Sequence, residues 1–213
     1  MNMPRRTTGE WIQVFCDLIL VNILWFVCSL PIITVGASTA ALHSVVRKMA
    51  ACEYYTVWRG FWHGFRENWK QGTAVALLLG LELVISWFDF TLGLRTPGLT
   101  GVVCQLLGVL GLIIGVFTLT FAFPVLTRYR LPLKTVLKNA LLLSIANPQI
   151  VLAGLAAAAL FPALGWLSIN LLIIAVPGEL LLGSGLPVLV QHLLMRKVYA
   201  RLEAGQASEA SNI

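Results

Sequence analysis

The chain has 213 residues, of which 58% are hydrophobic and only 11% are charged, and its formal net charge is +6. A soluble globular domain carries about 25% charged residues, so this composition leaves too few charges to cover a water-exposed surface. The basic residues lie in short clusters between apolar runs instead of forming one patch, which argues against a nucleic-acid-binding protein. The composition indicates an integral membrane protein whose main partner is the lipid bilayer.

Apolar stretches divide the chain into membrane spans. A helix rises 1.5 Å per residue, so about 20 residues cross a hydrocarbon core of about 30 Å. Most of the stretches meet this length, whereas residues 32–46 form a shorter segment rich in Gly, Ala, Ser and Thr. In chain order, we expect spans at residues 11–30, 32–46, 72–92, 101–125, 141–164 and 169–191.

The fold class that follows is all-α, a polytopic bundle of membrane helices. We expect residues 1–202 to form a single transmembrane domain, because no part of the chain has the composition of a soluble domain. Residues 203–213 are short, polar and rich in Ala, Ser and Gly, so we expect a disordered tail.

The distribution of basic residues bears on whether residues 32–46 cross. Lys and Arg concentrate in the short cytoplasmic loops of membrane proteins. If residues 32–46 cross, fourteen of the fifteen Lys and Arg residues fall on one side, and Arg95 alone falls on the other. This pattern predicts six spans with both termini in the cytoplasm. A re-entrant hairpin over residues 11–46, broken at Pro31, gives the same sidedness and stays open as an alternative.

Aromatic and basic residues recur at helical spacing just before the third predicted span. Aromatic side chains favour the headgroup level and basic side chains are attracted to anionic lipid, so we expect an amphipathic helix flat on the cytoplasmic leaflet. The same surface also suits docking of a partner subunit. Its members are Trp58, Arg59, Phe61, Trp62, Phe65, Arg66, Trp69 and Lys70.

Two carboxylates lie inside predicted spans, Glu82 in the third and Glu179 in the sixth. An intramembrane carboxylate is costly unless it is protonated, paired or wetted, so each is a candidate polar site. A protonated Glu that is hydrogen-bonded to a neighbouring helix is an equally simple interpretation. Pro177 and Gly178 interrupt the sixth span, which is typical both of broken transport helices and of close helix packing.

The sequence offers no convincing catalytic motif. The run from Gly36 to Thr39 resembles the Gly-x-Ser-Gly of intramembrane serine proteases, but Thr39 stands where the last Gly is needed. There is no H-E-x-x-H and no phosphate-binding glycine loop, and the cysteines are scattered without metal-ligand spacing. We therefore predict a non-enzymatic protein with no catalytic residues, no metal and no cofactor.

One motif carries a family resemblance. The run from Leu30 to Leu42, together with a second-half segment that includes Phe123, Pro124 and Arg128, is similar to the YesL-like family of bacterial integral membrane proteins. The resemblance implies a small multi-span protein of the bacterial cell membrane, associated with ABC-type carbohydrate uptake. We expect the motif to shape a packed or re-entrant element through Pro31, Gly36, Ser38 and Thr39.

Two functional hypotheses follow from these observations. The leading one is an accessory or regulatory component of carbohydrate uptake, with ABC transporter subunits as partners. The alternative is a small secondary transporter or channel that uses Glu82 and Glu179 within the membrane.

Overall fold

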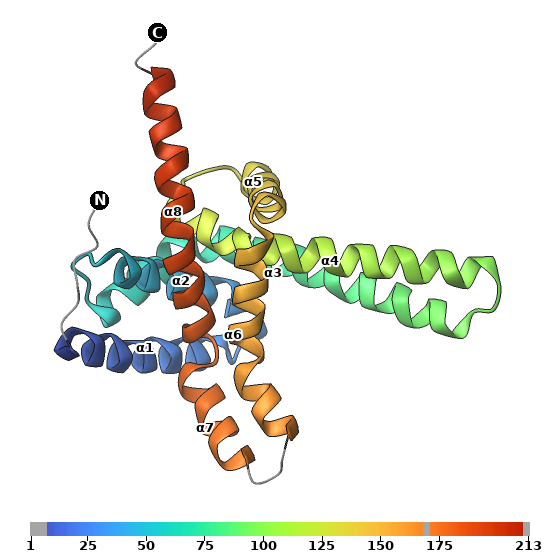
Figure 1. The fold of residues 1–213 in the computed structure, drawn as a ribbon, viewed down its shortest axis with the longest axis horizontal. Helices are drawn as coiled ribbons and strands as arrows, with labels where there is room; N and C mark the ends of the chain where they lie inside the picture. Colours follow the sequence, from blue (N-terminus) through green and yellow to red (C-terminus); the bar gives the residue numbers. More distant parts are fainter. Residues whose placement is uncertain (1–7, 168–170, 211–213) are drawn as a thin grey trace.

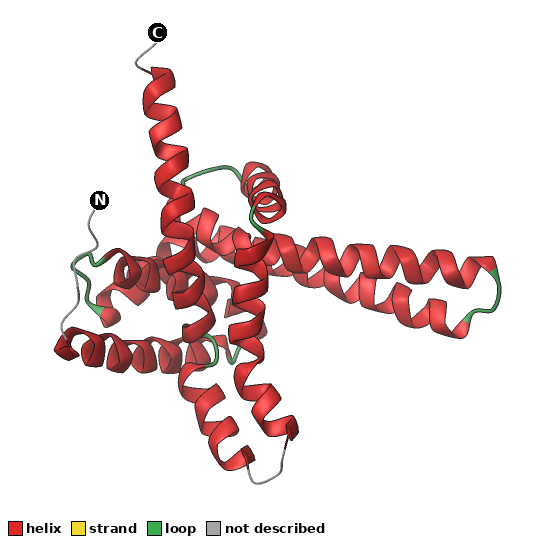
Figure 2. Cartoon of the chain, viewed as in Figure 1, coloured by secondary structure: helices red, strands yellow, loops and turns green. Residues whose placement is uncertain are grey.

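A computed structural model describes residues 8–167 and 171–210 (Figure 1). Every element in these ranges is helical (Figure 2), which confirms the all-α class. The elements are α1 (Thr8–Ser29), the short 3-10 helix η1 (Ile32–Thr34), α2 (Val35–Ala51), α3 (Val57–Arg95), α4 (Leu99–Arg128), α5 (Leu133–Ala146), α6 (Pro148–Leu167), α7 (Leu172–Leu182) and α8 (Gly185–Ala210).

Several of these helices are built to cross a membrane. By length and apolarity α1, α3, α4 and α6 each qualify, which makes 4 candidate spans. The pair α7 and α8 qualifies together as a fifth span, bent by 58° at its break. The chain is therefore a multi-span membrane protein. The predicted second span falls on η1 and α2, and α2, with 17 residues, is shorter than α1, α3, α4 and α6.

The structure differs from the sequence prediction at the aromatic and basic segment. A separate interfacial helix does not form, because residues 57–95 make one continuous helix of 39 residues. No proline occurs within α3, so nothing ends the helix between the amphipathic segment and the third predicted span. Phe61 is fully buried in the core, whereas Trp58 and Trp69 are exposed, so part of the aromatic stripe serves packing.

Two other predicted boundaries also change. The span predicted at residues 141–164 is divided at Asn147, which leaves the helical conformation with φ −135° and ψ 59°. Pro148 disfavours helix at the residue before it, so it starts a new helix, α6, after this break. The last helix, α8, runs to Ala210 and so includes residues 203–210, for which the sequence predicted a disordered tail. Residues 211–213 of that tail lie outside the described residues.

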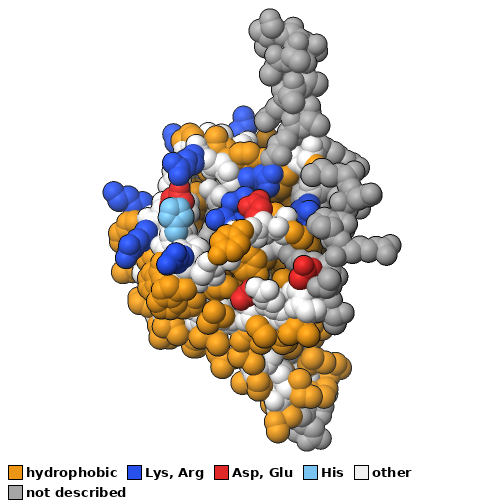
Figure 3. Space-filling view, turned by 90° about the vertical axis from the view of Figure 1, so that its left-hand side faces the viewer, with side chains coloured by type: hydrophobic (Ala, Val, Ile, Leu, Met, Phe, Trp, Pro, Cys, Tyr) orange, Lys and Arg blue, Asp and Glu red, His pale blue; other side chains and the backbone are white. Residues whose placement is uncertain are grey.

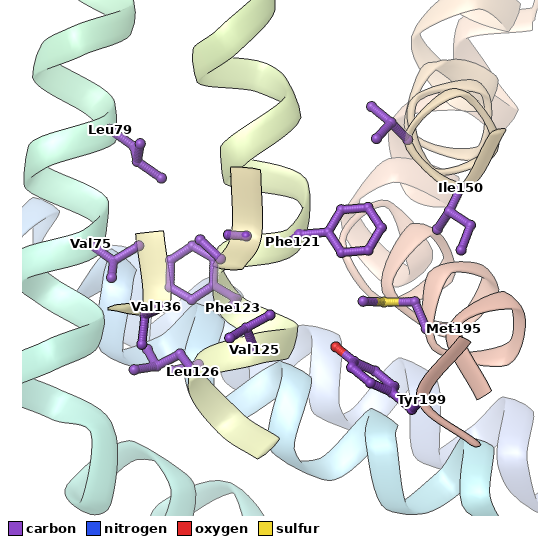
Figure 4. Packing of buried hydrophobic residues seen from close by; sticks show 14 residues of the cluster. Val75, Leu79, Phe121, Phe123, Val125, Leu126, Val136, Ile150, Met195 and Tyr199 are labelled. Carbon is purple, nitrogen blue, oxygen red and sulfur yellow. The ribbon is translucent and has the colours of Figure 1, made fainter. Parts of the chain in front are cut away.

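The helices form a packed base from which two hairpins diverge. Figure 1 shows α3 and α4 as one long hairpin and α6 with α7 as a second that points in another direction. The last turns of α4 lie in the base, where Phe121, Phe123 and Val125 are buried. Figure 4 shows these side chains between Val75 of α3 and Met195 of α8. The base therefore joins both halves of the chain in one hydrophobic core.

Close contact between two glycines holds α2 against α3. A Cβ atom added to Gly36 would lie 2.1 Å from the carbonyl oxygen of Gly72, and one added to Gly72 would lie 2.7 Å from that of Gly36. Two turns further along, a Cβ on Gly64 would lie 2.2 Å from Oγ of Ser44. Small residues at such spacing allow the backbones of membrane helices to approach closely.

The glycine contact generates a stability prediction. Replacing Gly36 with Ala places a methyl group against backbone that cannot move aside, which we expect to cost about 1–3 kcal/mol through overpacking. The apparent melting temperature of the purified protein in mild detergent should fall by several degrees. The matched control is Gly80→Ala in α3, where an added Cβ meets nothing within 4 Å. Equal melting temperatures for the two variants would contradict the packing role of Gly36.

Candidate functional site

A pocket of 470 Å³ lies where α2 meets the bases of the two hairpins. One face of α2 contributes Val35, Thr39 and His43, spaced four residues apart as one helix face requires. The opposite walls come from α3, α4, α6 and α8 and are largely apolar, with Gln191 of α8 among the few polar groups. Concave apolar pockets with a few convergent polar groups are the usual form of a binding site.

Two buried histidines form the polar centre beside this pocket. Nδ1 of His43 lies 3.2 Å from Nε2 of His192, so one imidazole donates a hydrogen bond and the other accepts it. The exposed fractions are 5% for His43 and 3% for His192. The ring of His43 also stacks on Phe123 at a centroid distance of 5.8 Å. Because the bond uses Nδ1 of His43, its Nε2 remains for a ligand in the pocket.

The hydroxyl groups of the sequence motif link α2 to α1. Nε1 of Trp25 donates a hydrogen bond to Oγ1 of Thr39 at 3.1 Å. Oγ of Ser38 lies 2.6 Å from Oγ of Ser29 and also donates to the backbone carbonyls of Thr34 and Val35. Pro31 lies between the two helices in an extended conformation. These contacts give Ser38 and Thr39 structural partners and position the pocket face of α2.

Asn22 joins α1 to the break between α7 and α8. Its Nδ2 donates to the carbonyl oxygen of Leu180 at 2.7 Å, and its Oδ1 accepts from the backbone N–H groups of Ser184 and Gly185 at 3.1 and 3.0 Å. Asn22 is 1% exposed. Lipid supplies no hydrogen bonds, so a broken membrane helix needs such a partner for its free backbone groups. Sequence reasoning missed Asn22, although a lone Asn inside a first span was a usable signal.

The structure does not bring the two intramembrane carboxylates together. Glu179 lines a second pocket, of 680 Å³, at the α7–α8 break beside Asn22. Glu82 belongs to the α3–α4 hairpin, where a Cβ on Gly115 would lie 2.0 Å from its Oε2. Oγ of Ser86 donates to Oε1 of Glu82 at 3.2 Å. Glu179 therefore lies at the α7–α8 break and Glu82 lies between α3 and α4, so the two glutamates do not form one shared polar site.

The aromatic and basic residues predicted to form one surface lie along the first turns of α3, where some are buried and others are exposed. Phe61 belongs to the core, and Trp62 and Phe65 are half-buried beside it. The exposed members are Trp58, Arg59, Arg66, Trp69 and Lys70. None of these residues lines the pocket beside His43.

Comparison with known proteins gives one match. Residues 18–90 match the family described as a protein of unknown function, DUF624. The match runs from within α1 through α2 and most of α3, so it includes Asn22, the glycine contact and the pocket face of α2. No curated protein and no solved structure matches the chain. The similarity supports an uncharacterised family, and the finer resemblance to the YesL-like proteins stays a prediction.

The junction at Asn22 generates the next prediction. Replacing Asn22 with Ala leaves backbone groups of the α7–α8 break without partners, which we expect to cost about 1–3 kcal/mol. Hydrogen exchange measured by mass spectrometry should accelerate at the amides of Ser184 and Gly185. The control is Asn68→Ala, because Nδ2 of Asn68 donates to the carbonyl oxygen of Gly64 within the same helix, α3. Unchanged exchange at the break would show that Asn22 does not hold it.

Proposed function

We propose that this chain is a non-enzymatic membrane subunit that accompanies an ABC-type carbohydrate uptake system. The observation that carries the proposal is the pocket of 470 Å³ between two diverging apolar hairpins. A pocket between two diverging hairpins can accept side chains of a partner's transmembrane helix. The link to carbohydrate uptake comes from the resemblance of the motif at residues 30–42 to the YesL-like family.

The chemistry of the pocket favours a helix over a free sugar as its occupant. A buried sugar needs hydrogen bonds for most of its hydroxyl groups, and unpaired ones cost free energy. The pocket wall is largely apolar, with Leu83, Leu155 and Val188 among its members. Thr39, His43, Thr120 and Gln191 are the polar residues in the lining, which suits one polar side chain on a partner helix.

The partners of the polar groups support a non-enzymatic role. The Ser38 hydroxyl bonds to Ser29 and to backbone carbonyls, and His43 pairs with His192. A serine nucleophile would instead need one of these histidines as its base. Within the described residues, no group of three or more His, Cys, Asp or Glu side chains is arranged to hold a metal ion.

The proposal also includes the topology of the chain. We propose that it crosses the bacterial cell membrane six times and that both termini lie in the cytoplasm. The α7–α8 pair then counts as the last span, and η1 with α2 forms the short second one. The distribution of charge supports this orientation, since fourteen of the fifteen basic residues share one side. In Figure 3, lysine and arginine side chains gather on the upper part of one face and hydrophobic side chains cover its lower part.

Transport by the chain itself is a second candidate, favoured by the break between α7 and α8. Broken helices at membrane depth are typical of transport sites, and Glu179 lines the pocket at this break. Glu82 lies on the other hairpin. A transport site in this protein would therefore use Glu179 with Asn22, without Glu82.

Cysteine labelling tests the second span. In a variant with all four native cysteines replaced, Ile33→Cys should react with a membrane-impermeant maleimide in intact cells, because the chain reaches the outer surface there. Ile33 is 64% exposed, so the protein itself does not block the reagent. The matched control retains Cys52 alone, which should react only after the cells are permeabilised. Labelling of Ile33→Cys only after permeabilisation would support the re-entrant hairpin.

Photo-crosslinking tests the accessory role. A photoreactive amino acid at Leu155, which lines the pocket, should form a crosslink to a membrane subunit of a carbohydrate transporter in cells that express both. The control carries the same amino acid at Leu160 of α6, which is exposed but does not line the pocket. Crosslinks at Leu155 to lipid or to the chain itself alone would contradict the accessory role and favour the second candidate.

A further inference from the structure

A third pocket, of 610 Å³, lies at the opposite end of α2, where the chain turns into α3. Its lining combines the last turns of α2, the loop at residues 52–56 and the first turns of α3. The basic side chains in this lining are Arg47, Lys48 and Arg59, with His63 beside them. This pocket is distinct from the one between the hairpins.

The positive charge of this pocket is not compensated by neighbouring carboxylates. Glu67 is the acidic residue in the lining, and it already pairs with Arg130 and lies 3.4 Å from Nε2 of His63. Among the described residues, no carboxylate pairs with Arg47, Lys48 or Arg59. The excess positive charge calls for an anionic ligand.

The side chain of Arg47 adds an independent observation. Its Nε atom is buried and has no hydrogen-bond partner among the described residues. A buried donor without a partner costs about 1–3 kcal/mol, and the side chain of Arg47 that carries this donor lines the pocket. A guanidinium group matches a phosphoryl group particularly well, because its planar N–H groups donate to two oxygens at once.

The start of α3 adds a further attraction for anions. Thr56 caps this helix without a side-chain hydrogen bond to its first turn, and Thr56 lines the pocket. The free N–H groups of a first helical turn carry partial positive charge. The positive charges of Arg47 and Arg59 and the partial positive charge of this helix end therefore all attract an anion into the same pocket.

We propose that this pocket binds a phosphoryl group that carries net negative charge. Arg47 and Arg59 hold its oxygens, and Lys48 adds charge. Tyr54, which lines the pocket, is 93% exposed, and Trp58 in the first turn of α3 is 57% exposed. Aromatic side chains of this kind lie at the headgroup level of a bilayer. The ligand is either the headgroup of an anionic phospholipid or a soluble phosphorylated molecule, and the site is independent of the partner proposed above.

Binding measurements on the purified full chain test this site. After removal of endogenous lipid, native mass spectrometry should show retention of phosphatidylglycerol in preference to zwitterionic phosphatidylcholine. Isothermal titration with inorganic phosphate forms the second arm. Phosphatidylglycerol binding that excess phosphate does not displace identifies a lipid ligand. Phosphate binding that competes with the lipid identifies a site for soluble phosphorylated molecules as well, and either result supports the phosphoryl site.

Substitutions then locate the binding. Arg47→Gln and Arg59→Gln should each weaken retention about tenfold, which is the loss expected for one charge-assisted hydrogen bond. The exposed Arg59 can be replaced without disturbing the core, so this variant tests the site even where Arg47→Gln lowers stability. The matched control is Arg66→Gln on the same helix, which removes the same charge outside the pocket. Equal losses for Arg59→Gln and Arg66→Gln, or no binding of either probe, would overturn the proposal.

Discussion

The backbone contact between Gly36 and Gly72 determines how the rest of the protein is arranged. It lets α2 lie directly against the long helix α3, since any side chain at either position would force the two backbones apart. Once this face of α2 is fixed, the adjacent face, with Thr39 and His43, turns toward α4, α6 and α8. The pocket beside His43 thus exists because two membrane helices approach more closely than lipid-facing helices normally do.

Hydrogen bonds between polar groups inside the apolar bundle hold neighbouring helices together. Asn22 supplies hydrogen bonds to backbone groups at the break between α7 and α8. Trp25 donates a hydrogen bond to Thr39 where α1 meets α2. Lipid cannot replace a lost hydrogen bond, so each such contact is worth retaining even where its net energy is modest. The His43–His192 pair joins α2 to α8 in the same way, and His43 also lines the pocket.

The basic residues have two separable roles in the proposals made above. In the proposed topology, their distribution along the chain orients the spans, which depends only on which loops carry them. Their position in space gathers Arg47, Lys48 and Arg59 around one pocket, which depends on how α2 and α3 pack. A substitution such as Arg66→Gln removes charge of the first kind without altering the second, which makes the two roles distinguishable.

The sequence by itself determined the membrane character and the helical class, because long apolar runs have few other folded forms in lipid. It also located the helix break near Pro31. Tertiary structure alone decided the rest. His43 and His192 are 149 residues apart, so their bond depends on helix packing that hydropathy does not encode. The junction at Asn22 and the separation of Glu82 from Glu179 likewise follow from which helix faces meet, and only the packed molecule fixes those faces.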